Sequence, residues 1–375
     1  MTETEIDISK KTGEQQTGRW VRIVPDGILL EHGELSGPAP GEAMVRTLLA
    51  GICGSDLHAM KERHPFVPLP YRPGHEILGV VEELGGDADD APSAGLVAKS
   101  GPERLHAGDR VVVEPTIYCG QCKQCRRGAV NLCEHLAFFG TVYPTGGMAD
   151  RFVLPTNRLH VVPTALSNEQ AVLIEPLSTA VHAVGLVPNP TEGADPDLSG
   201  RTTVVIGAGT IGLLVLQVAR WAGAARIVVT DLLQDKRRRA LAFGADAVVD
   251  AGQGGVVEQV LAELGESADV VFDCVSTQST VEQALTMALK GGTVVVIGVP
   301  ANPVSVDLAL LQDRQIRIQG SAIYLPADFA TAIRLLADGL VSVEDIVTLT
   351  LPLDDVEAAF AAAGSGEHVK VLVRP

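Results

Sequence analysis

The sequence is poor in aromatic and in basic residues. Trp, Tyr and Phe make up 4% of its 375 residues, and 29 Lys and Arg stand against 46 Asp and Glu, for a net charge of -17. Such a surface repels phosphate backbones and anionic lipid, so we expect neither nucleic acid nor membrane partners. The chain also lacks an apolar run of about 18 residues and begins with an acidic segment, which predicts a cytoplasmic protein.

Cysteine is scarce as well, and four of the six cysteines lie close together at Cys119, Cys122, Cys125 and Cys133. This spacing is too tight for a dispersed disulfide framework and suits a metal site in a reducing compartment. Four thiolates are typical of a closed structural Zn2+ site with no open position for substrate. The alternatives are an iron-sulfur cluster, whose last gap is usually shorter, a chance cluster, and a zinc ribbon that binds nucleic acid, which the acidic chain disfavours.

The length predicts two domains, and the most regular pattern is an alternation of apolar runs with helical segments between residues 201 and 321. Helical spacing is clear at 213–221 and 280–289. Near-continuous apolar runs are typical of parallel strands covered on both faces, which predicts a doubly wound α/β sheet. The predicted strands are residues 202–206, 226–230, 247–250, 269–273, 293–297 and 316–319.

The first half of the chain has a different pattern, with short strands at 42–49, 78–84 and 110–113 interrupted by Pro and Gly. It predicts a mainly β domain. Near the end we expect helices at 328–337 and 355–363 and a strand at 369–373, which complete this first domain. Exposed loops and a disordered start are expected at 85–107, 188–199 and 1–18. The predicted boundaries are 1–180, 181–322 and 323–375.

A Gly-x-Gly-x-x-Gly sequence follows the first predicted strand of the second domain and opens a helix. In this context the glycines allow a pyrophosphate to approach the helix N-terminus. Asp231, 24 residues after Gly207, is placed to bind the ribose hydroxyls, which predicts NAD. Lys236, in a run of four basic residues, is either a partner for the 2'-phosphate of NADP or a solvated helix start. The candidate loop residues are Gly207, Gly209, Thr210, Ile211 and Gly212.

Three further segments form a recognisable set. Gly-Ile-Cys-Gly-Ser-Asp-Leu-His surrounds Cys53, Gly-His-Glu surrounds His75, and Ile-Glu-Pro-Leu-Ser surrounds Glu175. With the four cysteines and the glycine loop, these segments resemble the zinc-containing medium-chain dehydrogenases from about residue 20 onward. Within that family the sorbitol, butanediol and threonine dehydrogenases are the most similar. The resemblance implies a GroES-like catalytic domain and a Rossmann domain.

The resemblance also implies the metal ligands. Cys53 and His75 would bind a catalytic Zn2+, and Glu76 and Glu175 stand where the polyol branch has carboxylates that bind the metal directly or through its water. Thiolate, imidazole and carboxylate are ordinary zinc ligands, and three of them leave a position open for an alcohol oxygen. The alternatives are a small buried cysteine, a core histidine and a capping or ion-paired carboxylate.

The same resemblance implies a path for the proton. Ser55 matches a relay hydroxyl and His58 a relay imidazole, while Asp56 is expected to orient the metal ligands. The alternatives are a turn-forming serine and a surface histidine. His182, inside an apolar helix, is expected to have no special role.

These features together predict NAD-linked oxidation of a secondary hydroxyl in a small diol, polyol or cyclitol to a ketone. Residues 61–72, 138–143, Ile323 and Tyr324 are expected to line the pocket, and Ile323 replaces an arginine that sorbitol-type enzymes tend to have. A zinc-independent NAD(P)H-dependent reductase and a non-catalytic binding protein are the alternatives, both disfavoured by the intact metal and glycine motifs. We expect a homodimer or homotetramer that binds an alcohol or ketone.

Overall fold

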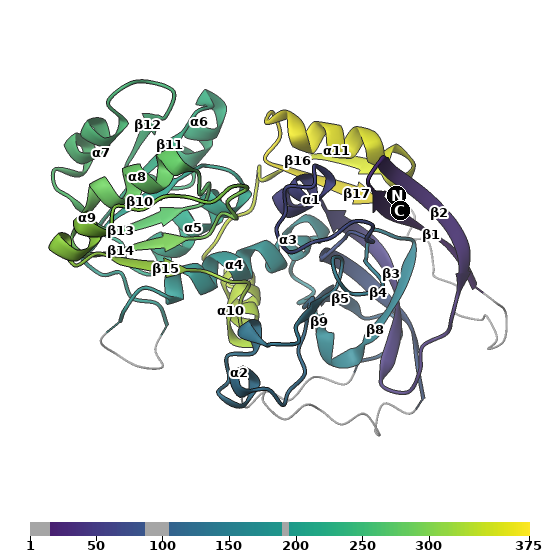
Figure 1. Cartoon of the computed structure of the whole chain (residues 1–375). Coiled ribbons are helices and arrows are strands. Elements are labelled where there is room, and N and C mark those ends of the chain that lie inside the picture. Colours follow the sequence, from purple (N-terminus) through teal and green to yellow (C-terminus); the bar gives the residue numbers. More distant parts are fainter. Residues whose placement is uncertain (1–15, 87–104, 190–194) are drawn as a thin grey trace.

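The computed structural model describes residues 16–86, 105–189 and 195–375, and it contains two bodies side by side, each built on its own large sheet (Figure 1). The disordered start was predicted to extend three residues too far. Residues 16–18 already belong to β1 (Gln16–Val24), which pairs with β2 (Gly27–Leu35) over its whole length. The rest of that segment, most of the predicted loop 85–107, and residues 190–194 of the predicted loop 188–199 lie outside the described residues.

The second body is the predicted parallel sheet, with the strand order β12-β11-β10-β13-β14-β15. The order reverses between β10 and β13, and in such sheets ligands bind at the carboxyl ends of the strands near this point. β14 begins earlier than predicted, and its pairing with β13 has a register shift between Ala288 and Thr293, the stretch that contains its glycine pair. The strands are β10 (Thr202–Ile206), β11 (Arg226–Asp231), β12 (Ala247–Asp250), β13 (Ala268–Asp273), β14 (Ala288–Val296) and β15 (Arg317–Gly320).

Helices connect these strands and cover the sheet. The basic run containing Lys236 forms the start of one of these helices, α6. The strand β10 is buried along its whole length. This burial explains the unbroken apolar run. The helices are α5 (Thr210–Trp221), α6 (Gln234–Ala242), α7 (Val256–Leu264), α8 (Gln278–Met287) and α9 (Leu308–Arg314).

The first body contains a seven-stranded, mainly antiparallel sheet with the order β16-β17-β3-β4-β5-β9, and β8 also pairs with β3. The end of the chain also joins this sheet, because Leu372 of β17 is paired with Gly51 of β3. β16 was not predicted. The strands are β3 (Glu42–Gly51), β4 (Glu76–Leu84), β5 (Arg110–Val113), β8 (Arg151–Pro155), β9 (Leu159–Val161), β16 (Val347–Pro352) and β17 (Lys370–Arg374).

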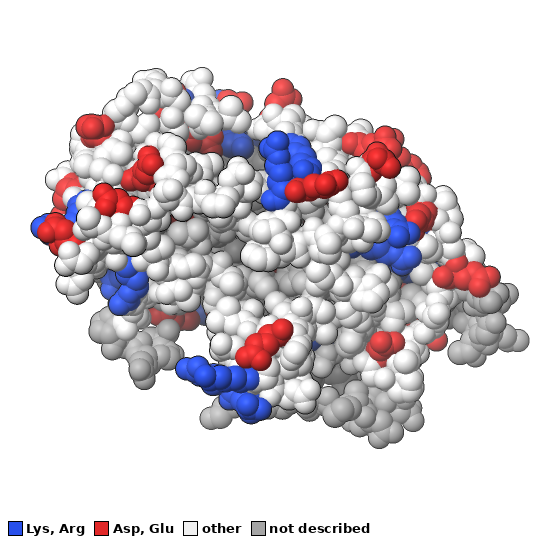
Figure 2. All heavy atoms as spheres, in the orientation of Figure 1, with Lys and Arg blue, Asp and Glu red and all other residues white. Residues whose placement is uncertain are grey.

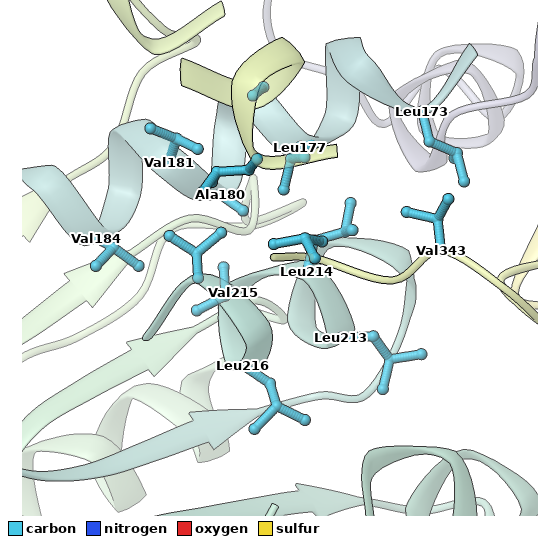
Figure 3. Close-up of a cluster of buried hydrophobic side chains, with 14 of the residues drawn as sticks. Leu173, Leu177, Ala180, Val181, Val184, Leu213, Leu214, Val215, Leu216 and Val343 are labelled. Carbon is cyan, nitrogen blue, oxygen red and sulfur yellow. The ribbon is translucent and has the colours of Figure 1, made fainter. Parts of the chain in front are cut away.

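A central helix, α4 (Ile174–Gly185), joins the two bodies. Leu177 and Ala180 of α4 lie in the same buried cluster as Leu214 and Val215 of α5 (Figure 3). On another side α4 packs against α10 (Pro326–Ala337). Close packing of this kind leaves a helix little freedom to shift, so the residues in the first turn of α4 have a fixed position. The remaining helices and short strands are α1 (Gly54–Met60), α2 (Lys123–Arg126), α3 (Asn168–Val172), α11 (Val356–Ser365), β6 (Thr116–Ile117) and β7 (Ala137–Phe138).

Charged side chains are scattered over the visible face in small groups of both signs, separated by broad uncharged areas (Figure 2). Within the described ranges, no helix combines the length and apolarity needed to cross a bilayer.

Candidate metal and cofactor site

Cys53, His75 and Glu76 come together where β3 and β4 meet. Cys53 is the N-cap of α1 and lies two residues after the end of β3. Glu76 is the first residue of β4, where it is paired with Gly51, and His75 directly precedes it. One ligand atom from each lies within 4.8 Å of those of the other two. His75 and Glu76 are only 4% and 1% exposed, so their donor atoms face one another inside the protein.

Asp56 holds the backbone of Cys53 in place. Its Oδ2 accepts the Cys53 N–H at 3.1 Å, and its Oδ1 accepts the Tyr71 hydroxyl at 2.9 Å. Because Asp56 is buried and bonded through both oxygens, the start of α1 cannot rotate freely. This geometry suits the orienting role predicted for Asp56. Tyr71 was not singled out from the sequence.

Lys370 is another residue of the site that was not predicted from the sequence. Its Nζ lies 2.6 Å from each carboxylate oxygen of Glu76 and donates to the Ile52 carbonyl at 3.1 Å. Both charged side chains are almost fully buried. The available signal was a lysine directly before the apolar run 371–373, because a buried cation requires a partner of opposite charge.

Glu175 lies in the first turn of α4, and its charge acts on His75, but it is not among the three residues whose donor atoms lie within 4.8 Å of one another. It is 6% exposed, and its Oε1 accepts the Tyr324 hydroxyl at 2.8 Å. Burial raises the pKa of Glu175 to about 7, although the charge of His75 acts in the opposite direction. Tyr324 was expected to line the substrate pocket. It is 1% exposed, and its hydroxyl donates to Glu175.

The electrostatics of this cluster fit a metal cation. Burial alone would lower the pKa of His75, but the hydrogen bond with Cys53 and the charges of Asp56 and Glu175 raise it to about 10. A buried site that favours a proton this strongly also favours other positive charge. His75 Nδ1 is buried and has no hydrogen-bond partner among the described atoms. The mixed thiolate, imidazole and carboxylate donors are those of a catalytic zinc site.

The four clustered cysteines fit a second metal. The Sγ atom of Cys133 lies 3.5 Å from that of Cys119 and 4.0 Å from that of Cys122. Four sulfurs bound tetrahedrally at a zinc-sulfur distance of about 2.3 Å would be about 3.8 Å apart. Backbone N–H groups of Cys122 and Cys125 donate to these sulfurs, and the cysteines are free thiols. The lobe formed by residues 119–133 therefore has the geometry of a closed zinc site.

The glycine loop follows β10 and opens α5. Gly207 has a φ of +92°, which favours glycine, and a Cβ on Gly212 would lie 1.7 Å from the Gly207 carbonyl oxygen. A Cβ on Gly209 would meet no protein atom within 4 Å. The first and third glycines are thus required by the protein itself, and the second leaves space in front of the helix N-terminus where a pyrophosphate fits.

Asp231 ends β11 next to this loop. Its Oδ2 accepts the Ala208 N–H and its Oδ1 the Leu233 N–H, both at 2.8 Å. Lys236 is half-buried in α6, and it is the neighbouring Arg237 that donates to the Asp231 carbonyl.

Two other loop residues face different surroundings. The Thr210 hydroxyl donates to the Val369 carbonyl at 2.7 Å, next to Lys370, and Ile211 is half-buried against the core around α4 and α5. Thr210 therefore links the cofactor loop to the strand that contributes Lys370.

Ser55 and His58 both lie on α1, after Cys53. Ser55 is half-buried and His58 is exposed. Among the described contacts no hydrogen bond joins them, so the proton relay stays a prediction.

Comparison with known proteins gives two family matches. Residues 39–164 match the alcohol dehydrogenase GroES-like domain, and residues 210–338 match the zinc-binding dehydrogenase model. The chain is 30% identical to D-xylulose reductase A of Aspergillus oryzae over 88% of this chain and 89% of that one. It is 31% identical to L-idonate 5-dehydrogenase of Vitis vinifera over 97% and 96%.

Solved structures agree with these matches. A zinc-binding dehydrogenase from Sinorhizobium meliloti, bound to NADP, has a TM-score of 0.83 at 30% identity, covering 96% of this chain and 100% of that one. The 2R,3R-butanediol dehydrogenase of Bacillus subtilis has a TM-score of 0.81 at 28% identity, covering 96% and 99%. The predicted fold class, GroES-like plus Rossmann, is confirmed, and the chain belongs to the zinc-binding alcohol dehydrogenase family.

Proposed function

We propose that this protein is a zinc-dependent, NAD-linked dehydrogenase that oxidises a secondary hydroxyl of a small diol, polyol or cyclitol to a ketone. The observation that supports this most directly is the buried cluster of Cys53, His75 and Glu76, with the charge of Glu175 acting on His75. Three different donors leave a coordination position open for substrate. Three of the relatives named above are named for small polyhydroxylated compounds or diols: D-xylulose reductase A, L-idonate 5-dehydrogenase and 2R,3R-butanediol dehydrogenase.

The chain's own residues prepare the site for this reaction. When bound, zinc lowers the pKa of the alcohol hydroxyl and NAD accepts the hydride. Asp56 orients Cys53, Lys370 balances the charge of Glu76, and the Tyr324 hydroxyl orients Glu175. We further propose that Ser55 receives the substrate proton and that His58, which is exposed, delivers it to water.

The proposed cofactor is NAD, bound by Gly207, Gly209 and the N-terminus of α5. Asp231 supports this preference, because its carboxylate stands at the end of β11, where it would repel a 2'-phosphate. Lys236 is the residue that would favour NADP instead. The distance of the Lys236 ammonium group from the adenosine ribose determines how strict the preference for NAD over NADP is.

A panel experiment tests the proposed function. Protein loaded with zinc is incubated with NAD or NADP and with diols, sugar alcohols or cyclitols, and the absorbance of the reduced cofactor is followed. We expect turnover with NAD and at least one polyhydroxylated substrate, and its loss in a Cys53→Ala variant. Turnover without bound zinc, or equal turnover in the variant, would contradict the proposal.

We also propose a cytoplasmic homodimer or homotetramer. The six free cysteines suit a reducing compartment, and the acidic chain disfavours nucleic acid. β15 is the last strand of its sheet, and Ile318 on it is 38% exposed, which suits pairing with a second copy. Sedimentation of the purified protein checks the oligomeric state.

A further inference from the structure

His182 was expected to have no special role, but its ring joins three parts of the chain. It lies in α4 and is 7% exposed. Its Nδ1 is 2.7 Å from Asp328 Oδ2 in α10, and its Nε2 is 3.3 Å from Asn131 Nδ2 in the four-cysteine lobe. Because the carboxylate accepts, Nδ1 carries the proton and Nε2 accepts an N–H of Asn131. Figure 1 shows α10 between α4 and the lobe around α2.

The same polar groups also bond both ends of the segment 322–325. The second N–H of the Asn131 amide donates to the Ala322 carbonyl at 2.9 Å. At the other end, Asp328 Oδ2 accepts the Leu325 N–H at 2.8 Å in addition to the His182 N–H. The donors of Asn131 are thus fully used, and the segment is held from the lobe at one end and from α10 at the other.

Between these two ends the backbone is strained. Ile323 has a φ of +56°, in the left-handed region that a β-branched side chain rarely adopts. Such a conformation persists only where surrounding contacts hold it. The next residue, Tyr324, is fully buried and donates its hydroxyl to Glu175. The strained turn therefore determines where this hydroxyl lies.

We propose that Asn131, His182 and Asp328 are positioning residues that hold the Tyr324 hydroxyl against Glu175, so that the four-cysteine lobe supports the catalytic metal site. This proposal rests on the metal site of the proposed function. It gives the lobe a part in the reaction in addition to its part in folding. The coupling runs through bonded neighbours from the lobe to the Glu175 carboxylate.

The test compares Asn131→Leu with Tyr324→Phe in the full-length, zinc-loaded protein. Leucine has a similar shape but donates to neither the Ala322 carbonyl nor His182. Both variants should lose the catalytic metal to a chelator about 3- to 10-fold faster than the wild type, the change expected from one lost hydrogen bond. With cobalt exchanged into the catalytic site, both should shift the visible absorption bands. In the zinc-loaded protein, Asn131→Leu should also speed amide hydrogen exchange within residues 321–327.

A double variant distinguishes a positioning role of Asn131 from a general loss of stability. In the Tyr324→Phe background, Asn131→Leu should add little further change to metal loss or to the cobalt bands, because the affected hydroxyl is already absent. Gln217→Met is the matched control, since Gln217 is another buried amide, on α5, whose oxygen accepts the Ser342 N–H. It should lower stability without changing either signal.

Unchanged cobalt bands in Asn131→Leu, or effects that add fully to those of Tyr324→Phe, would overturn the proposal. If Asn131→Leu does not fold, Asp328→Leu removes the bond at the other end of the segment with no substitution in the lobe, and the same coupling with Tyr324→Phe is required. The spectra and the exchange need no substrate. Failure of the proposed oxidation is therefore distinguishable from failure of the positioning role.

Discussion

At the scale of single residues, the metal cluster depends on the absence of a side chain at Gly51. A Cβ on Gly51 would lie 2.0 Å from Glu76 Oε2 and 2.9 Å from its Cβ. Glu76 is held on its other side by the Lys370 ammonium group. The carboxylate therefore fills the space between a bare backbone and a buried cation, and it has no room to move.

Gly51→Ala should displace the Glu76 carboxylate and weaken the catalytic site. We expect alcohol oxidation to fall by at least about 10-fold, since a 1 Å misplacement of a catalytic group has effects of this size or larger. Kinetics and metal analysis of the purified variant measure this. Gly37→Ala is the control, because a Cβ there meets nothing within 4 Å. Equal activity in the two variants would contradict the crowding at Gly51.

At the scale of elements, the strand-loop-helix unit of β10 and α5 distinguishes two uses of glycine. Gly212 allows α5 to approach the loop, whereas Gly209 leaves space that no protein atom fills. Gly212 is therefore needed for the packing of the protein, and Gly209 for the space that the cofactor occupies.

Gly209→Ala and Gly212→Ala should both weaken NADH binding by at least about 10-fold, for different reasons. The first should keep nearly wild-type stability, because its Cβ meets only the cofactor. The second should unfold at lower denaturant concentration, because its Cβ would overlap the Gly207 carbonyl. Fluorescence titration and denaturant unfolding measure the two effects. Tight NADH binding by Gly209→Ala would show that the pyrophosphate lies elsewhere.

A buried ion cluster connects β5, β9 and the turn between β8 and β9. Glu114 accepts from Arg158 at 2.9 Å and from His160 at 2.8 Å, and Thr116 also donates to it. Burial alone would raise the pKa of Glu114, but the hydrogen bond with His160 and the charge of Arg158 outweigh it, and the pKa is lowered.

Acid should remove this contribution to stability. Because the folded pKa of Glu114 lies below the unfolded value of about 4.3, the unfolded chain binds the proton more readily, and stability is lost as the pH falls through the folded pKa. Glu114→Gln should have a smaller acid slope below pH about 4.3 and lose about 3 kcal/mol at pH 7, where Arg158 is left unpaired. Denaturant unfolding across pH 3 to 7 checks this. Glu266→Gln, which changes an exposed carboxylate, should match the wild type.

At the scale of the whole molecule, the two thiolate sites have different structural roles. The cysteines of the lobe lie within residues 119–133, whereas Cys53, His75 and Glu175 come from separate parts of the first body. A closed four-cysteine site contributes directly to folding, and an open site with fewer ligands contributes less.

Cys53→Ser should therefore lower the zinc content from about two ions per chain to about one and leave the fold intact. Metal analysis with far-ultraviolet circular dichroism measures both. Cys274→Ser is the control, because Cys274 belongs to neither cluster, and it should keep both ions. Joint loss of the two metals from Cys53→Ser would show that the sites are not independent.

Much of this protein was predictable because its main signals are local in sequence. The parallel sheet follows from unbroken apolar runs, the cofactor loop from the spacing of Gly207, Gly209 and Gly212, and the lobe from four cysteines within 15 residues. Local backbone geometry and side-chain chemistry determine such features wherever they occur.

Only the tertiary structure decided which distant residues meet. Lys370 reaches Glu76 because β17 pairs with β3, and Tyr324 bonds to Glu175 because α10 packs on α4. The ring of His182 joins Asn131 to Asp328 across three elements. No spacing in the sequence encodes these contacts, because they depend on strand order and helix packing, and a buried charge or imidazole acquires its role only from the partner that the fold brings to it.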